Sequence, residues 1–209
     1  TTTLGNRTRF DYDALNQLRK ITDALGGLTD LTYDLNGNLL GLTDARGGAT
    51  SYAYDAMDRV TTRTDPLRRA ESYGYDGNGN PTALTDRKGQ ATSRTYDALD
   101  RVTLVSYRDG STTALTWDAG NRLTQIVDSL AGTIIRGYDM LDRLIQEITP
   151  QGTVSYTYDL AGRRTSQTVP GQPTVSYTYA SADRLTQVAQ GGNTITLAYD
   201  PAGRRTHLS

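Results

Sequence analysis

A tyrosine followed directly by an aspartate is the combination in this sequence that offers acid–base chemistry. The phenolic hydroxyl can donate a proton, and the neighbouring carboxylate can accept one. The combination recurs along the whole chain of 209 residues, however, and a catalytic site is not built many times in one register. One copy has tryptophan in place of tyrosine, which keeps a large ring and removes the phenolic proton. We therefore interpret these pairs as structural and predict no catalytic residue, and so no enzyme.

The aromatic residues mark ten repeats, and we call the aromatic residue of each repeat its anchor. Successive anchors are 21 residues apart six times, and then 20, 21 and 20 residues apart. An aspartate follows nine of the ten anchors, and Ala180 is the exception. The predicted anchors and their aspartates are Tyr12, Asp13, Tyr33, Asp34, Tyr54, Asp55, Tyr75, Asp76, Tyr96, Asp97, Trp117, Asp118, Tyr138, Asp139, Tyr158, Asp159, Tyr179, Tyr199 and Asp200.

The fourth residue after each anchor is always glycine, asparagine or aspartate, the residues that most readily adopt a left-handed backbone. This restriction predicts a turn position with positive φ, placed as the last residue before the next strand. The aspartate after the anchor can accept hydrogen bonds from amides across that turn. The ten turn positions are Asn16, Gly37, Asp58, Gly79, Asp100, Asn121, Asp142, Gly162, Asp183 and Gly203.

The residues that lead up to each anchor alternate with the period of a β-strand. Val154, Tyr156 and Tyr158 share one face, and Ser155 and Thr157 share the other. A second, threonine-rich strand follows each turn, so every repeat contributes two strands and two turns. We predict an all-β fold, in which a single array of about ten repeats over residues 1–209 forms roughly twenty antiparallel strands. Because sheets twist, this array should form a long curved or spiral sheet, whose open edges permit self-association.

The composition excludes several classes of function. The formal net charge is −1, from 22 basic and 23 acidic residues, which does not favour a nucleic-acid partner. No apolar run of about 18 residues is present, so no membrane-spanning helix is expected. With no cysteine, disulfides and cysteine-based zinc sites are excluded. We expect no cofactor and no metal, and we interpret the chain as a fragment of a longer repeat protein, without a targeting signal of its own.

Three further features could in principle bind a ligand or do chemistry, and we interpret each of them as structural. His207 is the one histidine, and no metal site or catalytic triad can be assembled around it. Two glycine-rich stretches, Gly77-Asn78-Gly79-Asn80 and Gly191-Gly192-Asn193, lack the lysine of a phosphate-binding loop and recur as turns. An arginine follows the turn position in seven repeats, where we expect local salt bridges; a stripe that binds polyanions is the less favoured alternative. These arginines are Arg59, Arg101, Arg122, Arg143, Arg163, Arg184 and Arg204.

The repeat resembles the YD repeats of the RHS family. The resemblance is clear in Tyr54-Asp55-Ala56-Met57-Asp58-Arg59-Val60 and covers essentially the whole chain. The family includes bacterial RHS polymorphic toxins, shell components of insecticidal toxin complexes and animal teneurins. The resemblance implies a hollow shell that encloses a C-terminal toxin or other cargo, with the rest of the parent shell as partner. It also implies a parent protein that is secreted, lies on the cell surface or is delivered by a secretion system.

Two functions remain open from the sequence: a scaffold that encapsulates a cargo polypeptide, and an extracellular module for carbohydrate binding or adhesion. They differ in the role of the tyrosine rings. Rings packed against neighbouring strands indicate a scaffold, whereas rings exposed along a groove offer platforms on which sugars stack. The tyrosines lie on the more apolar face of each strand, which favours packing.

Overall fold

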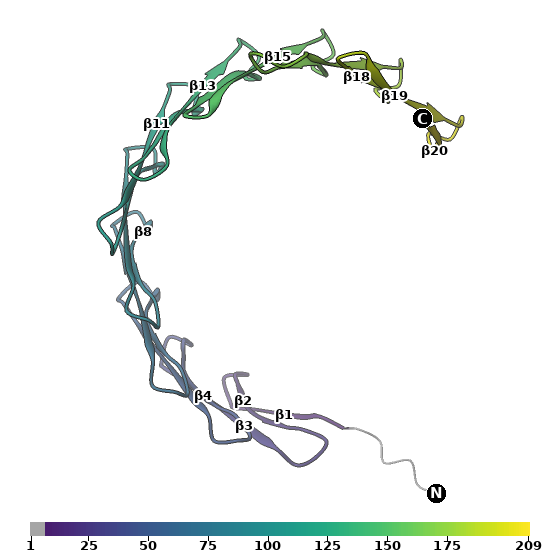
Figure 1. Ribbon diagram of the computed structural model, residues 1–209. Coiled ribbons are helices and arrows are strands. Elements are labelled where there is room, and N and C mark those ends of the chain that lie inside the picture. The colour runs from purple at the N-terminus through teal and green to yellow at the C-terminus, as the bar shows by residue number, and fades with distance from the viewer. Residues whose placement is uncertain (1–6) are drawn as a thin grey trace, which may run out of the picture. The chain divides into compact units, whose positions relative to one another are not determined.

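The computed structural model describes residues 7–209, which contain twenty β-strands and no helix, and so no helix able to cross a membrane. The chain divides into two compact units, Thr1–Gly110 and Ser111–Ser209. Figure 1 labels many of the strands, from purple at the N-terminus to yellow at the C-terminus. The first unit holds β1 (Arg9–Tyr12), β2 (Leu18–Thr22), β3 (Leu28–Tyr33), β4 (Leu39–Thr43), β5 (Ala49–Tyr54), β6 (Val60–Thr64), β7 (Ala70–Tyr75), β8 (Pro81–Thr85), β9 (Ala91–Tyr96) and β10 (Val102–Tyr107). The second unit holds β11 (Thr112–Trp117), β12 (Leu123–Asp128), β13 (Gly132–Tyr138), β14 (Leu144–Thr149), β15 (Gly152–Tyr158), β16 (Arg164–Thr168), β17 (Val175–Tyr179), β18 (Leu185–Gln190), β19 (Asn193–Tyr199) and β20 (Arg205–Leu208).

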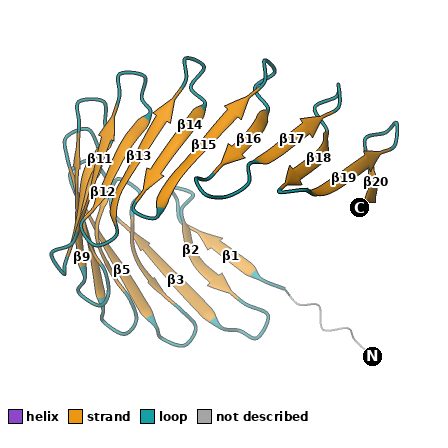
Figure 2. Ribbon diagram, turned by 45° about the horizontal axis from the view of Figure 1, so that its top comes forward, coloured by secondary structure: helices purple, strands orange, loops and turns teal. Residues whose placement is uncertain are grey.

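Within each unit, every strand pairs in antiparallel fashion with its neighbours in the sequence. In the first unit Leu31 of β3 pairs with Leu42 of β4, and Leu42 pairs in turn with Thr50 of β5. In the second unit Tyr177 of β17 pairs with Val188 of β18, which pairs with Ile195 of β19. Short loops connect the strands (Figure 2). The prediction of an all-β fold built from tandem antiparallel hairpins is confirmed.

The turns fall into two sets that differ in the hairpins they close. Odd-numbered strands end at an anchor, and we call the turns that follow them the anchor turns; the turns that follow even-numbered strands are the far turns. A register shift marks the hairpin at each anchor turn: Tyr138 pairs with Leu144 while Gly137 pairs with Gln146, so Ile145 forms a β-bulge. Within each unit, the hairpins closed by the far turns run without such a shift, as between β14 and β15.

The predicted place of the turn position relative to the strand is wrong by one residue. In the anchor turn after β13, Asp142 has positive φ, but Arg143 lies between it and the first residue of β14. The additional residue is needed to close the turn, because the carbonyl of Arg143 accepts a hydrogen bond of 3.0 Å from the amide of Asp139. The other anchor turns have the same spacing, since each even-numbered strand begins six residues after its anchor.

No hydrophobic residue of the described chain is buried, so each unit lacks a hydrophobic core. Along β3 the side chains of the anchor face are half-buried and those of the opposite face are exposed, whereas in β6 both faces are half-buried. In β5 the opposite face carries only Ala49, Ser51 and Ala53. Without a core, stability must come from contacts between adjacent strands and adjacent repeats, as in other repeat proteins.

Arg68 gives a prediction for the far turns. It has φ of 61°, whereas glycine occupies the equivalent position in three other far turns, at Gly26, Gly47 and Gly89. An L-residue in this conformation costs about 1–2 kcal/mol, and glycine removes that strain at a smaller entropic cost. We expect Arg68→Gly to raise the free energy of unfolding by about 0.5–1 kcal/mol in denaturant titrations. Arg68→Ala removes the same side chain and keeps the strain, so an equal gain for that variant would contradict the explanation.

Candidate functional site: the anchor turns

Every anchor turn has the same backbone frame. After β13, the amide of Asp139 donates to the carbonyl of Arg143 at 3.0 Å, and the amide of Asp142 donates to the carbonyl of Asp139 at 3.2 Å. All ten turn positions have positive φ, between 57° and 93°: Asn16, Gly37, Asp58, Gly79, Asp100, Asn121, Asp142, Gly162, Asp183 and Gly203. Only glycine, asparagine and aspartate reach this region at low cost, which explains the restriction in the sequence.

The aspartate after the anchor fixes the turn through both of its carboxylate oxygens. Oδ1 of Asp139 accepts hydrogen bonds from the amides of Leu141 at 2.9 Å and Arg143 at 3.0 Å. Oδ2 accepts from Nε and Nη2 of the Arg143 guanidinium, both at 2.7 Å. The carboxylate therefore satisfies two amides that the backbone of the turn leaves unpaired. The same two amide bonds occur at Asp13, Asp34, Asp55, Asp76, Asp97, Asp118 and Asp159.

The arginine of one anchor turn also contacts the next repeat. Nη1 of Arg143 donates to the carbonyl of Asp159 at 3.0 Å, and the guanidinium lies over the ring of Tyr158, 4.8 Å from its centroid. We call this unit the repeat bridge: an Asp-Arg pair of one repeat joined to the anchor ring and turn carbonyl of the next. Repeat bridges with both the carbonyl bond and the ring contact are formed by Arg59, Arg122, Arg143 and Arg163.

The anchor hydroxyls connect the repeats in the opposite direction along the chain. The hydroxyl of Tyr158 donates at 2.7 Å to the carbonyl of Leu144, the first residue of the even-numbered strand before it. This carbonyl lies beside the β-bulge. The same bond is made by Tyr54, Tyr75, Tyr96, Tyr138, Tyr158, Tyr179 and Tyr199. The hydroxyls thus act as structural donors, and the rings pack against neighbouring repeats.

Asparagine replaces the arginine in two repeats, and its shorter side chain bonds to the aspartate at the turn position of the next repeat. Nδ2 of Asn80 donates to its own turn aspartate, Asp76, at 3.0 Å and to Asp100 of the next turn at 2.6 Å. Asn78 donates to Asp100 as well, at 2.9 Å. The stretch Gly77-Asn78-Gly79-Asn80 is therefore an anchor turn, as the sequence indicates, and its side chains bind a carboxylate of the protein itself.

The electrostatics of the turns oppose acid catalysis. Hydrogen bonds from the Arg143 guanidinium lower the pKa of Asp139, and those from Arg59 lower the pKa of Asp55. A general acid needs a raised pKa near the working pH. The structure also holds no group of three histidine, cysteine, aspartate or glutamate side chains suited to a metal ion among residues 7–209. His207 lies exposed in β20, paired with Ala198. The aspartates and arginines of the anchor turns therefore serve to hold the turn backbone and the anchor rings in place.

A network of charged side chains near the far turns of the first unit was not predicted from the sequence. Asp65, only 3% exposed, pairs with Arg69 at 2.7 Å and lies 3.6 Å from Arg87. Nε of Arg87 also pairs at 2.8 Å with Glu71, which pairs with Arg63 at 3.2 Å. These residues come from β6, β7 and two far turns, so the network joins adjacent repeats. The signal in the sequence is weak, because its members follow no common spacing.

The lowered pKa of Asp65 gives a prediction for acid unfolding. The Arg69 guanidinium, through its hydrogen bonds, holds this pKa at about 2. Because the folded-state pKa lies below the ordinary value of about 3.9, the contribution of Asp65 is complete above that value and is lost as the pH falls through about 2. We expect the Tm, followed by circular dichroism, to fall from about pH 4 to about pH 2. Asp65→Asn should show a shallower fall; parallel curves for the two proteins would contradict this role of Asp65.

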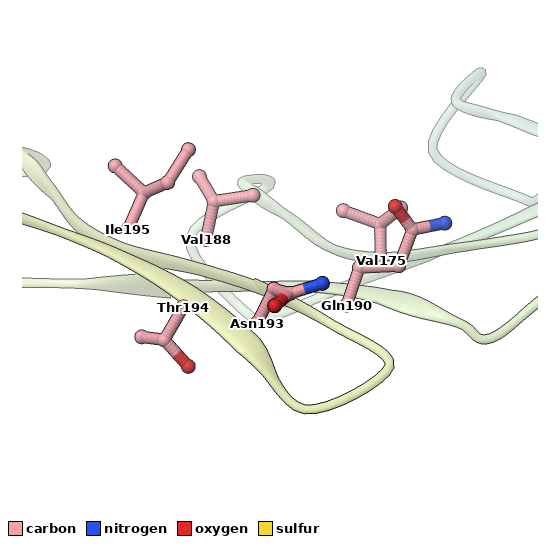
Figure 3. Close-up of a pocket in the computed structure, with 6 residues that line it drawn as sticks. All are labelled: Val175, Val188, Gln190, Asn193, Thr194 and Ile195. Carbon is pink, nitrogen blue, oxygen red and sulfur yellow. The ribbon is translucent and has the colours of Figure 1, made fainter.

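A shallow hollow lies at the surface of β17, β18 and β19 (Figure 3). It is lined by Val175, Val188, Gln190, Asn193, Thr194 and Ile195. Ile195 and Val188 point to the same side of the sheet, and Thr194 points to the opposite side. The lining contains no charged group, and its one hydroxyl, that of Thr194, points to the opposite side of the sheet from Val188 and Ile195.

The comparisons with known proteins agree with this repeat geometry. A family model described as RHS Repeat matches residues 33–70, 75–112, 96–133 and 138–174, together more than half of the chain. The chain belongs to the RHS repeat family. Each matched segment contains two anchors and therefore two successive repeats. Successive repeats also alternate at the turn position, where Asp58, Asp100, Asp142 and Asp183 are separated by glycine or asparagine. No match was found among curated proteins.

Solved structures of Tc toxin proteins have the same RHS fold over nearly the whole chain. TcdB2-TccC3-TEV gives a TM-score of 0.67 at 18% identity, covering 96% of this chain and 14% of that chain. The Photorhabdus luminescens Tc holotoxin pore gives 0.56 at 14% identity, covering 97% and 17%. TcdB2-TccC3 gives 0.52 at 14% identity, covering 98% and 16%. The chain therefore spans less than a fifth of the length of these structures, and at such identities the likeness establishes the fold.

Proposed function

We propose that this RHS chain is a wall segment of a hollow shell that encloses a toxin or other cargo polypeptide. The observation that carries the proposal is the repeat bridge. Four such bridges link neighbouring repeats within the two units, which contain no buried apolar residue among the described residues, and this suits a thin wall that is extended by adding repeats. In this proposal residues 1–209 are one array within a longer repeat region, and the wall acts by exclusion and not by catalysis.

The covered tyrosine rings disfavour the carbohydrate-binding alternative. A sugar platform needs an open ring face, but guanidinium groups lie over the anchor rings of Tyr75, Tyr138, Tyr158, Tyr179 and Tyr199. The hydroxyls of the same five tyrosines donate to backbone carbonyls. Their polar groups are therefore engaged by neighbouring repeats and not presented to a ligand.

The partners of the segment follow from the same proposal. They are the remaining repeats of the parent shell, which continue from its open sheet edges, and the enclosed C-terminal polypeptide. The parent protein would be secreted, held at the cell surface or delivered by a secretion system. The presence of RHS folds in a Tc holotoxin structure supports this assignment by analogy.

Limited proteolysis of the full-length parent protein tests the proposal. We expect the C-terminal polypeptide to resist protease in the intact protein and to be degraded when repeat bridges are removed, for example in the Asp139→Ala/Asp159→Ala variant. Two results would reject the enclosing role. One is a cargo that stays protected in the Asp139→Ala/Asp159→Ala variant, and the other is a cargo that is degraded as fast in the intact protein as in that variant. Arg68→Gly, which leaves the bridges unchanged, serves as the matched control.

A further inference from the structure

The ninth anchor turn, between β17 and β18, lacks the carboxylate found in the other nine. Ala180 stands in its place, yet the backbone frame is unchanged. The amide of Ala180 donates to the carbonyl of Arg184 at 2.8 Å, and the amide of Asp183 donates to the carbonyl of Ala180 at 3.1 Å. Asp183 keeps its positive φ of 58°. The turn is therefore built as in the other repeats, with the acceptor removed.

The donors that serve the missing carboxylate remain in place. Nε of Arg184 is buried and has no hydrogen-bond partner among the described residues. Within residues 7–209, the amides of Ala182 and Arg184 have no hydrogen-bond acceptor either. In the preceding anchor turn, the equivalent three donors all bind Asp159: the amides of Ala161 and Arg163 at 3.0 Å each, and Nε of Arg163 at 2.7 Å.

The charges around the ninth turn leave one guanidinium without a carboxylate. Arg163 pairs with Asp159 at 2.7 Å and with Asp183 at 2.9 Å. In the tenth anchor turn, Arg204 pairs with Asp200 at 2.7 Å. Arg184 lies over the ring of Tyr199, 5.6 Å from its centroid, but forms no salt bridge among the described residues. The neighbouring carboxylates are thus paired with other arginines, while Arg184 is attracted electrostatically to Asp200 without forming a salt bridge to it.

We propose that the ninth anchor turn is a binding site for a carboxylate supplied from outside the turn. A free carboxylate would contact the methyl group of Ala180 at van der Waals distance instead of being bonded to it, so it would lie roughly 2 Å farther out. Ser181, Ala182 and Asp183 are exposed, so the turn is open to solvent, and the Arg184 side chain must shift to bring its buried Nε to the ligand. A ligand as small as formate should bind in the millimolar range. An acidic side chain of a protein segment carries the same group and gains affinity from its remaining contacts.

Titration of the uniformly ¹⁵N-labelled chain with sodium formate tests the site, with sodium chloride at equal ionic strength as the reference. We expect saturable shifts of the Arg184 Nε–H and of the amides of Ala182 and Arg184. The Nε–H of Arg163 is an internal control, since Asp159 already occupies it. Ala180→Asp should abolish the response, because a carboxylate of the chain itself would then fill the site, and it should also raise the Tm. Arg184→Gln should abolish the response by removing the guanidinium.

The outcomes separate the proposal from a general effect of salt. Shifts that do not saturate, that are equal at Arg163 and Arg184, or that persist in Ala180→Asp and Arg184→Gln would reject the site. A parallel titration with N-acetyl-aspartyl-methylamide identifies the source of the carboxylate. Binding of both compounds assigns the site to acidic side chains of a protein segment, whereas binding of formate alone assigns it to small free acids.

Discussion

Asp139→Ala is expected to lower the Tm by roughly 5–10 °C, a large effect for a single side chain. The substitution removes an acceptor for two backbone amides and the partner of the Arg143 guanidinium. The side chains of Asp139 and Arg143 are only 22% and 24% exposed, so solvent replaces these bonds incompletely. Arg143 would also lose the group that holds it over Tyr158, and the bridge to the next repeat would weaken.

The control for this variant removes an aspartate of a different kind. Asp30 is 54% exposed and lies 3.6 Å from Lys20, an ion pair of the sort that contributes little to stability. We therefore expect the Tm of Asp30→Ala to stay close to that of the unaltered chain. Hydrogen exchange should show faster opening of β13 to β16 in Asp139→Ala alone. Equal Tm values for the two variants would mean that the anchor-turn carboxylates do not hold the repeats together.

Gly162→Val is expected to reduce the free energy of unfolding by about 2 kcal/mol through backbone strain alone. Gly162 has φ of 83°, a conformation that β-branched residues adopt at high cost. A Cβ atom at this position would meet no other atom within 4 Å, so the variant creates no steric clash with neighbouring residues. The expected loss therefore isolates the conformational requirement of the turn.

Gly162→Asn provides the matched comparison, because asparagine or aspartate occupies the same position in six other repeats with φ between 57° and 64°. We expect this variant to lose less than about 1 kcal/mol. Urea denaturation of both variants measures the difference. If valine and asparagine were equally tolerated, positive φ could not explain the restriction of the turn positions to glycine, asparagine and aspartate.

The period of the repeat and its local turn chemistry could be predicted from the sequence. Each depends on residues close in the chain: an aspartate reaches amides two and four residues on, and a strand alternates with period two. The connections between repeats could not be predicted in the same way. The contact of Arg143 with the ring of Tyr158 spans 15 residues, and the bond from that hydroxyl to Leu144 spans 14. They are made by residues beside the β-bulges that shift the register at the anchor turns.

The role of Arg143 illustrates the limit of the sequence argument. A local salt bridge with Asp139 is expected from the spacing of four residues, and that pair is present. The same guanidinium also binds the next turn, which becomes apparent only when neighbouring hairpins are placed side by side. Ala180 shows the same limit. In the sequence it is only an exception to the Tyr-Asp pattern, whereas in the structure its presence leaves the buried Nε of Arg184 without an acceptor.

A structure of the full-length parent protein by cryo-electron microscopy tests the central claim most directly. The account predicts that residues 7–209 form part of the wall of a closed shell, with repeat bridges intact and density for the C-terminal polypeptide inside. If instead these repeats form a stalk or an adhesive surface with both faces open to solvent and no enclosed polypeptide, the proposal of an encapsulating wall is wrong.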